Sequence, residues 1–267
     1  MLQLTSLGTR VLLDWAVRTT GTALQVRLYR NQIDEQNLLN PSVIQEADFT
    51  GYTPVQLARA SWQAPSMGRQ GIAELRYGTQ QQFSFGSQQI IRGAYVTNLA
   101  SELLIIDQFS DAVDQQAGSS LFFSPRLSLG DFGQGSVVIP TEGQLELLDW
   151  IYRSAGADQR FRLFSNDLQP DHDTVVADFT EANFTGYSFR ALQRTGWLPA
   201  SQLSVQQARI QYGTDLTWTP ASNQTVYGYY VTNQAGTRVL WANRFAAPLS
   251  IQTGVELVQQ VSLTLYR

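Results

Sequence analysis

The feature that most constrains how this chain can fold is an internal duplication. Several segments recur at one constant spacing of 135 residues (147 − 12 = 135). A constant offset over so many positions predicts two copies of one unit, which we place at residues 1–133 and 134–267. Each copy has the size of a whole domain and is too long for a solenoid repeat. The clearest matching pairs are Leu12-Leu13-Asp14-Trp15 with Leu147-Leu148-Asp149-Trp150, Phe49-Thr50-Gly51-Tyr52 with Phe184-Thr185-Gly186-Tyr187, and Gly93-Ala94-Tyr95-Val96-Thr97-Asn98 with Gly228-Tyr229-Tyr230-Val231-Thr232-Asn233.

Hydrophobic periodicity predicts one short helix at the start of each copy and strands after it. The helices are expected at about residues 7–19 and 141–155, where apolar residues recur at the helical spacing. Residues 24–30 and 159–164 alternate between apolar and polar, as half-buried strands do. We therefore predict an all-β protein with two tandem antiparallel β-sandwich (jelly-roll-like) domains, each with a short N-terminal helix. Further strands are expected near 57–62, 72–77, 82–85, 89–97, 102–109 and 119–129, with counterparts in the second copy.

Comparing the two copies predicts which side of one strand faces the core. Alternate residues of a strand point to opposite faces. Tyr95/Tyr230, with Ile91/Val226 and Thr97/Thr232, are similar or identical pairs and are expected in the core. The intervening pairs Arg92/Tyr227 and Ala94/Tyr229 differ, and are expected to face solvent or a partner.

Composition excludes several classes of chemistry. The 267 residues include no Cys, no Lys and a single His, His172. A disulfide framework, a zinc–thiolate site and a Schiff-base lysine are therefore impossible, and we expect no cofactor. The formal charge of −4 argues against nucleic acid as a partner. No long apolar run predicts a membrane span, and the first residues do not form a standard signal peptide.

Two acidic segments have both a chemical and a structural interpretation. Asp171-His172-Asp173 could hold a cation or serve a hydrolase, although a solvated turn between strands is the simpler interpretation. Asp107, Asp111 and Asp114 are predicted to lie in a loop, which could bind calcium, contact a partner, or be merely acidic.

The tryptophans divide into two groups. Trp15/Trp150 and Trp62/Trp197 occur in both copies within apolar patterns, which indicates core packing. Trp218 and Trp241, with Tyr227 and Tyr229, are the candidates for an exposed aromatic patch that binds sugar or protein.

The strand motifs of the second copy resemble a domain found in structural proteins of tailed bacteriophages. The resemblance rests on Gly228-Tyr229-Tyr230-Val231-Thr232-Asn233, Val239-Leu240-Trp241, Phe245 and the segment from Gly254 to Leu263-Thr264-Leu265. It implies a virion protein, made in the bacterial host cytoplasm, that binds the major capsid protein or other virion proteins and forms homo-oligomers on the particle. It implies no catalytic residues.

The leading hypothesis is a capsid decoration (cement) protein that binds across subunits of the capsid lattice. The alternatives are a tail, neck or baseplate component, a glycan-binding adhesion module, and an enzyme using His172. We expect the loops at 107–117 and 242–253 to contact partners. The candidate partner-binding residues are Arg92, Asp111, Asp114, Trp218, Tyr227, Tyr229 and Trp241.

Overall fold

The protein is all-β, as the sequence predicts. A computed structural model describes residues 2–4, 15, 21–33, 41–67, 73–129, 137–138, 150, 156–204 and 207–266. All strand pairs in these ranges are antiparallel. The two predicted helices lie outside the described residues except for Trp15 and Trp150. The described single-turn 3-10 helices are η2 (Pro41–Val43), η3 (Arg59–Ser61), η5 (Val176–Asp178) and η6 (Arg194–Gly196).

The first copy, here called repeat 1, contains a five-stranded sheet, a three-stranded sheet and a strand pair. The five-stranded sheet has the order β1-β8-β7-β2-β3, the three-stranded sheet β10-β5-β4, and the pair is β6-β9. The bounds are β1 (Leu2–Leu4), β2 (Leu24–Tyr29), β3 (Val55–Leu57), β4 (Ser66–Met67), β5 (Ala73–Arg76), β6 (Gln81–Ser84), β7 (Gln89–Asn98), β8 (Leu103–Gln115), β9 (Ser120–Phe123) and β10 (Arg126–Leu129).

The second copy, repeat 2, has the corresponding strands in corresponding sheets. Its five-stranded sheet has the order β11-β18-β17-β12-β13, beside the sheet β14-β15-β20 and the pair β16-β19. The duplication seen in the sequence is thus also a duplication of strand order. The bounds are β11 (Val137–Val138), β12 (Gln159–Phe164), β13 (Arg190–Leu192), β14 (Ser201–Ser204), β15 (Gln207–Gln211), β16 (Leu216–Trp218), β17 (Gln224–Asn233), β18 (Val239–Ile251), β19 (Leu257–Gln259) and β20 (Ser262–Tyr266).

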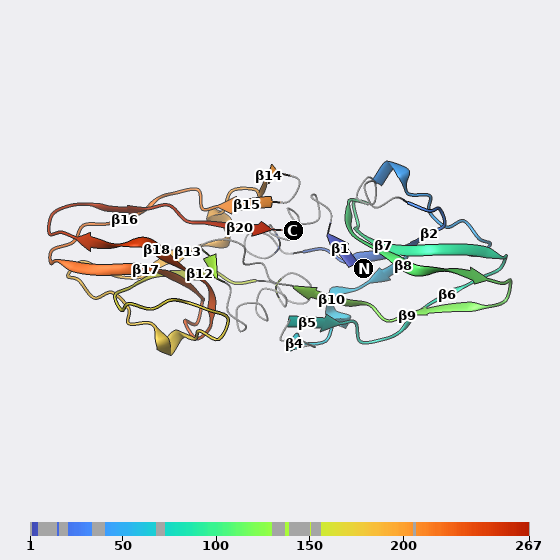
Figure 1. Cartoon of the computed structure of the whole chain (residues 1–267), viewed down its shortest axis with the longest axis horizontal. Coiled ribbons are helices and arrows are strands. Elements are labelled where there is room, and N and C mark those ends of the chain that lie inside the picture. Colours follow the sequence, from blue (N-terminus) through green and yellow to red (C-terminus); the bar gives the residue numbers. More distant parts are fainter. Residues whose placement is uncertain are drawn as a thin grey trace.

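The two repeats lie end to end in an elongated molecule (Figure 1). The pairs β6-β9 and β16-β19 lie toward opposite ends, and both chain termini lie near the middle. Most predicted strands are present, with three differences in extent. Residues 59–61 form η3, β8 continues to Gln115, and the run at 119–129 divides into β9 and β10 at Ser124-Pro125. Proline interrupts the run because it has no N–H to donate.

A β-bulge overturns the predicted faces of β7 and β17. The pairing of β7 with β8 shifts register between Ile91 and Gly93, and β17 shifts at the equivalent place. A bulge reverses the alternation of side chains beyond it. Ile91 and Ala94 therefore both join the large core, whereas Tyr95 packs in a smaller cluster on the other face. The prediction that Ala94 and Tyr229 face outward is wrong, because both are buried.

The core tryptophans lie where the sequence predicts. Trp15, Trp150, Trp62 and Trp197 are all buried, and one large cluster contains buried side chains from both repeats. Trp62 and Trp197 each make an edge-on contact with a tyrosine ring. The hydrophobic core is thus continuous between the repeats, although the boundary at residues 133 and 134 stays a prediction.

Two arginines form a reciprocal junction between the repeats. Arg59 of repeat 1 donates to the carbonyl oxygen of Trp150 in repeat 2, at 3.0 Å. Arg194, its equivalent (59 + 135 = 194), donates to the carbonyl oxygen of Trp15 in repeat 1, at 3.1 Å. Burial lowers the pKa of Arg194, with Asp158 opposing and the charge of Arg59 adding to the effect. This exchange of equivalent contacts is the pattern of a two-fold symmetric interface.

Tyr29→Phe is expected to stabilise the protein, most strongly at alkaline pH. The Tyr29 hydroxyl is buried and has no hydrogen-bond partner among the described residues, so removing it should gain up to about 1 kcal/mol at pH 7. Burial, with the charge of Asp107, raises the pKa of Tyr29 from 10.0 to about 12. The unfolded chain loses this proton first, so the wild type loses stability as pH rises from 10 to 12.

Urea unfolding at pH 7 and across this alkaline range would check the prediction. Repeat 2 already carries Phe164 at the equivalent position. The contrasting variant is Tyr52→Phe, because the Tyr52 hydroxyl donates to Glu46 at 2.9 Å and accepts from the Leu28 N–H at 3.0 Å. It should lose about 2 kcal/mol. A Tyr29→Phe protein less stable than wild type at pH 7 would contradict the argument.

Candidate functional site

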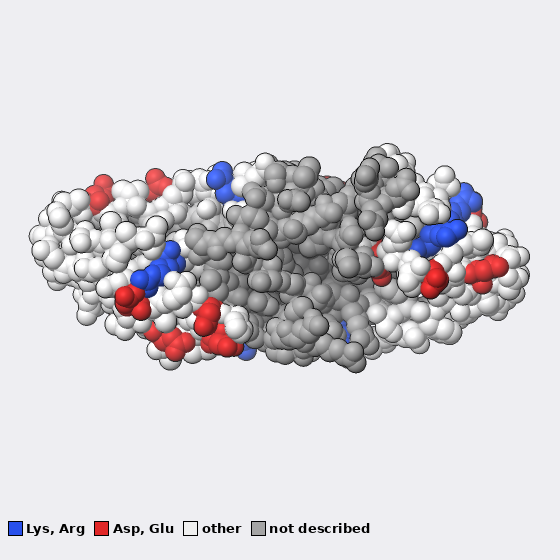
Figure 2. Space-filling model, in the orientation of Figure 1, with Lys and Arg blue, Asp and Glu red and all other residues white. Residues whose placement is uncertain are grey.

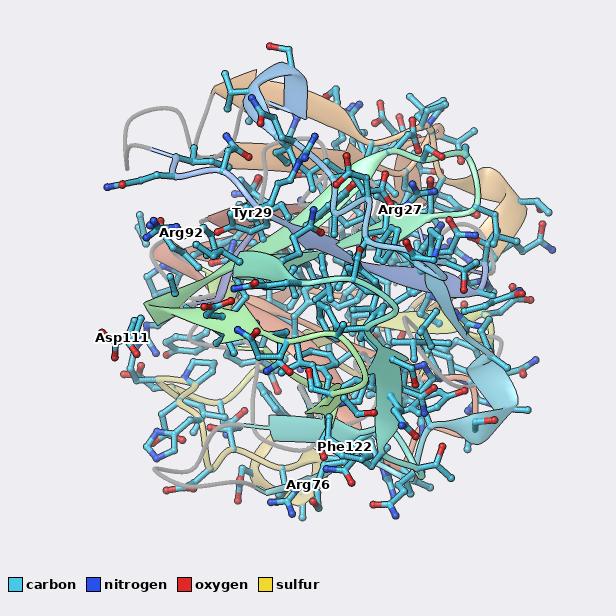
Figure 3. All side chains as sticks on the ribbon, turned by 90° about the vertical axis from the view of Figure 1, so that its right-hand side faces the viewer. Arg27, Tyr29, Arg76, Arg92, Asp111 and Phe122 are labelled. Atoms are coloured by element: carbon cyan, nitrogen blue, oxygen red, sulfur yellow. The ribbon has the colours of Figure 1, made fainter. Side chains whose placement is uncertain are left out.

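The long pair β7-β8 brings three of the predicted partner-binding residues together. Ile91 pairs with Val113 and Gly93 with Gln108, so the bulged segment 109–112 lies opposite Arg92. Seen from the repeat-1 end, Arg92 and Asp111 lie at one edge, away from Phe122 (Figure 3). Asp111 and Asp114 are exposed, and Asp114 accepts from the Gln88 side chain at 3.0 Å. The expected loops at 107–117 and 242–253 are largely strand, since β8 and β18 run through them.

The predicted exposed aromatic patch is wrong for three of its four members. Trp218, Trp241 and Tyr229 are all buried. Trp218 donates to the Ser188 carbonyl oxygen at 2.8 Å, so its polar atom is already used within the fold. Tyr227 is half-buried, with the Arg244 guanidinium 5.4 Å from its ring centroid. The tyrosines were predicted from strand alternation and the tryptophans from their lack of a tryptophan counterpart in the first copy, and neither signal shows what covers a side chain in the fold.

The Asp171-His172-Asp173 segment is a solvated turn, which was the simpler of the two interpretations. The His172 and Asp173 side chains are 74% and 82% exposed and lie 3.3 Å apart. Asp171 accepts from the Thr174 hydroxyl at 2.9 Å and from the Asp173 N–H at 3.0 Å. These hydrogen bonds, that of Thr174 first, lower the pKa of Asp171. Across the described residues, no group of three or more His, Asp or Glu side chains could hold a metal ion.

Apolar side chains are exposed at both ends of the molecule, in an otherwise weakly charged surface. Phe122 on β9 is 55% exposed, and Val258, its counterpart on β19, is 52% exposed. Further exposed apolar residues are Ile90 on β7 in repeat 1, and Leu249 on β18 and Val255 just before β19 in repeat 2. We call these two groups the distal apolar patches. On the face drawn in Figure 2, the described charged side chains are scattered, with both signs interspersed.

The same polar network occurs in both repeats, close to the smaller hydrophobic cluster of each five-stranded sheet. In repeat 1, Arg27 pairs with Glu46 at 2.9 Å, and Glu46 also accepts from Tyr52. Repeat 2 has the same network in Arg162, Glu181 and Tyr187. Burial is the main cause of the raised pKa of both Tyr52 and Tyr187, so both remain hydrogen-bond donors. Because both repeats keep it, the network supports the fold.

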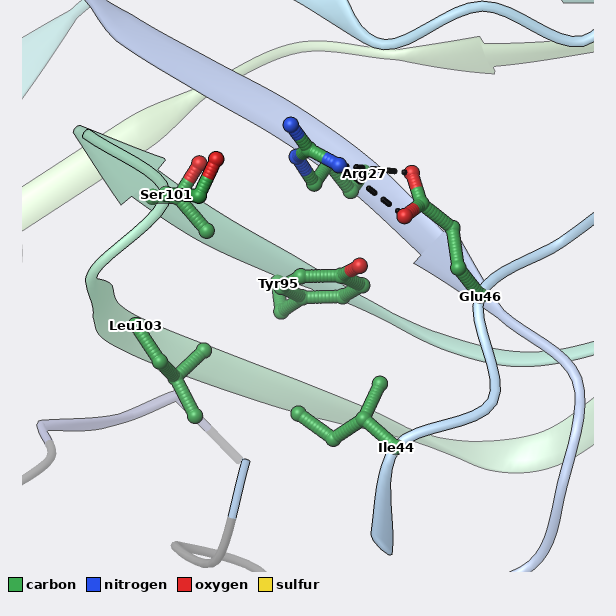
Figure 4. A pocket seen from close by; sticks show the side chains of 7 residues that line it. Arg27, Ile44, Glu46, Tyr95, Ser101 and Leu103 are labelled. Atoms are coloured by element: carbon green, nitrogen blue, oxygen red, sulfur yellow. Dashed lines mark hydrogen bonds and ion pairs between the residues drawn. The ribbon is translucent and has the colours of Figure 1, made fainter. Parts of the chain in front are cut away.

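In repeat 1 this network borders an open pocket. The pocket has a volume of about 200 Å³. Figure 4 shows the Tyr95 ring in its centre, with Arg27, Glu46 and Ser101 toward one side and Ile44 and Leu103 toward the other. Burial, followed by the Glu46 charge, raises the pKa of Tyr95, so its phenol stays neutral. The lining residues are Arg27, Ile44, Glu46, Tyr95, Thr97, Ser101 and Leu103.

Sequence reasoning missed this pocket, although the duplication contains a signal for it. Two of its residues differ in kind from their equivalents, because Ile44 replaces Phe179 and Ser101 replaces Gly236, while Leu103 replaces Val239 conservatively. The comparison of the repeats covered the strands β7 and β17 and the tryptophans, and neither difference lies among these. Extending it to every aligned pair would have marked both positions.

Comparison of the chain with protein-family models, curated proteins and solved structures finds no match. In the part of the chain that the structure describes, no helix has the length and apolar character needed to cross a membrane.

Proposed function

We propose that this protein is a virion structural protein of a tailed phage, a decoration protein that binds the capsid lattice across neighbouring subunits. In this proposal each repeat is a β-sandwich module, with the division at residues 133 and 134. The sequence resemblance to phage structural proteins supports it, as does the distribution of exposed side chains. Major capsid protein subunits are the proposed partners.

The observation that carries the proposal is the pair of distal apolar patches. Phe122 and Val258 occupy equivalent places on β9 and β19, which lie toward opposite ends of the molecule. A large apolar side chain left half-exposed contributes binding energy when a partner covers it, at about 25 cal/mol per Å² of apolar surface removed from water. Two such ends on one chain fit a protein that holds two neighbouring sites.

The mechanism is adhesion at two linked sites. Once one end is bound, the other meets its site at high effective concentration, which can raise overall affinity by about 10²–10⁴-fold. Gln82, which pairs with Phe122, and Gln260, two residues after Val258, are exposed and can donate and accept hydrogen bonds at the rim of each contact. The contact would then resist separation of the subunits that it joins.

A binding assay with variants at each end tests the proposal. Phe122→Glu or Val258→Glu should each weaken binding to capsids stripped of minor proteins by about 100-fold, because each removes one of two linked contacts. The double variant should not bind. Gln56→Glu adds the same charge at an exposed position of β3, which belongs to a different sheet from β9 and β19, and should bind as wild type. Unchanged binding of the double variant would refute the proposal.

The number of copies per particle separates a capsid location from a tail location. A decoration protein saturates capsids at a copy number set by the lattice, and cryo-electron microscopy would show it on the outer shell. A few copies confined to the tail, neck or baseplate would instead assign it to that part of the particle.

A further inference from the structure

The pocket of repeat 1 exists because one aromatic side chain of repeat 2 is replaced by a smaller one. In repeat 2, Phe179 stacks on Tyr230 with ring centroids 4.2 Å apart and planes within 8°. Phe179 is 8% exposed, so it fills the equivalent place. Repeat 1 keeps the tyrosine as Tyr95 but has Ile44 at the position of Phe179. Among the described residues, the Tyr95 ring, itself 8% exposed, therefore has the smaller Ile44 in place of the aromatic partner of Tyr230.

Polar groups without partners border the same pocket. Arg27 uses its two terminal nitrogens on Glu46 and Gln25, at 2.9 Å each, but its Nε has no partner in the described structure. The Thr97 hydroxyl, on a residue only 2% exposed, also has none. A buried polar group without a hydrogen bond costs about 1–3 kcal/mol. The Thr232 hydroxyl and Arg162 Nε of repeat 2 share this state, and in repeat 1 the equivalent residues line a pocket.

Ser101 adds a strained residue at the edge of the pocket. It is the only non-glycine residue with a positive φ in the described ranges, at 63°, whereas Gly236 takes its place in repeat 2 at 78°. A side chain in this conformation costs about 1 kcal/mol. The turn is held by the Asn98 side chain, which accepts from the Glu102 N–H at 3.0 Å. The serine thus places a hydroxyl at the pocket where glycine would fit the backbone better.

The charges and polarity of the lining residues indicate which kind of ligand the pocket would favour. Arg27 and Glu46 neutralise each other, so the pocket favours a neutral molecule over an ion. Hydrogen-bonding groups lie on one side, an aromatic ring lies in the centre, and Ile44 and Leu103 lie on the other side. A pyranose ring matches this pattern because it has hydroxyl groups around its edge and C–H bonds on its faces. A volume of about 200 Å³ is below the roughly 300 Å³ of pockets for drug-sized ligands.

We propose that the pocket lined by Arg27, Ile44, Glu46, Tyr95, Thr97, Ser101 and Leu103 binds the ring of a neutral monosaccharide. The sugar face packs on Tyr95, Ile44 and Leu103, and its hydroxyls exchange hydrogen bonds with Ser101, Glu46 and Arg27. This site is distinct from the aromatic patch considered in the sequence, whose tryptophans are buried. Repeat 2 cannot bind in the same way because Phe179 fills the space.

Saturation-transfer NMR and titration calorimetry on the full chain test the proposal. The probes are glucose, galactose and N-acetylglucosamine, with glucuronate as the charged comparison. We expect at least one neutral sugar to bind at one site with a Kd of about 1 mM. No saturable binding of any neutral probe at about 50 mM, far above that Kd, would overturn the proposal. Tighter binding of glucuronate than of every neutral probe would also overturn it.

Exchanging residues between the repeats supplies matched variants. Ile44→Phe introduces the residue of repeat 2 and should weaken sugar binding at least 10-fold. Ser101→Gly suits the positive φ of this position and removes one hydroxyl, so it should weaken sugar binding about 3-fold or more. It also keeps the proposal testable if Ile44→Phe does not fold. Phe179→Ile changes the equivalent place in repeat 2 and should leave the repeat-1 affinity unchanged. Wild-type affinity in both Ile44→Phe and Ser101→Gly would show that the sugar binds elsewhere.

Discussion

Gly228→Ala is expected to lower the free energy of unfolding by about 3 kcal/mol, a large loss for one added methyl group. A Cβ at this position would stand 2.2 Å from the Asn243 carbonyl oxygen and 2.7 Å from the Phe164 ring. The oxygen belongs to β18 and cannot retreat without disturbing its pairing with β17. Gly93→Ala should cost as much, because its Cβ would stand 2.3 Å from the Asp107 carbonyl oxygen.

Chemical denaturation of the two variants and of a third glycine variant would check this expectation. Gly118 has a φ of +82° with nothing within 4 Å of an added Cβ. Gly118→Ala therefore isolates the conformational cost, about 1 kcal/mol. If Gly228→Ala and Gly93→Ala cost no more than Gly118→Ala, the close approach of the strands is not what these two glycines provide.

The same glycines show how far a duplicated sequence can predict a fold. Gly93 and Gly228 match at the constant offset, and each lies opposite an aromatic residue of the neighbouring strand, Tyr29 or Phe164. The duplication, the all-β class and the buried tryptophan pairs were all predictable, because they depend on residue type and spacing alone. The close approach at these glycines depends on the register between strands, which spacing within one strand does not contain.

The errors in the predicted site arise from contacts between strands that are distant in the sequence. Strict alternation placed Ala94 and Tyr229 on the outer face, but the bulge before Gly93 and Gly228 reverses the order beyond it. A bulge adds residues to one strand of a pair, so it is a property of two strands and not of one sequence window. The prediction of exposed Trp218 and Trp241 failed similarly, because each is covered by elements distant in sequence.

The pocket was missed for a different reason. Arg27, Glu46, Tyr95 and Ser101 come from four separate segments, and none of them forms a motif. What distinguishes the site is a smaller side chain: Ile44 stands where repeat 2 has Phe179, beside a tyrosine that both repeats share. Such a difference becomes meaningful only when the structure shows that the two positions are equivalent and face the same ring.

Removing the arginines of the reciprocal junction is expected to weaken the coupling between the repeats. Arg194→Ala leaves the Trp15 carbonyl oxygen without this donor, and Arg59→Ala does the same for Trp150. A hydrogen bond from a charged group contributes about 1.5–3 kcal/mol, so each variant should lose about 2 kcal/mol. The double variant should lose more than the sum, because the charge of Arg59 disfavours the charged form of Arg194, and each single replacement already relieves that repulsion, which the double variant can relieve only once.

Thermal and urea unfolding of the four proteins in this cycle would measure the coupling. A junction that joins the two cores predicts a single cooperative transition in the wild type and two separable transitions in the double variant. Arg30→Ala is the matched control, since Arg30 pairs with Asp48 at 3.0 Å in a largely exposed ion pair that contributes at most about 1 kcal/mol. Equal losses for Arg194→Ala and Arg30→Ala, with one transition throughout, would mean that buried apolar contacts alone join the repeats.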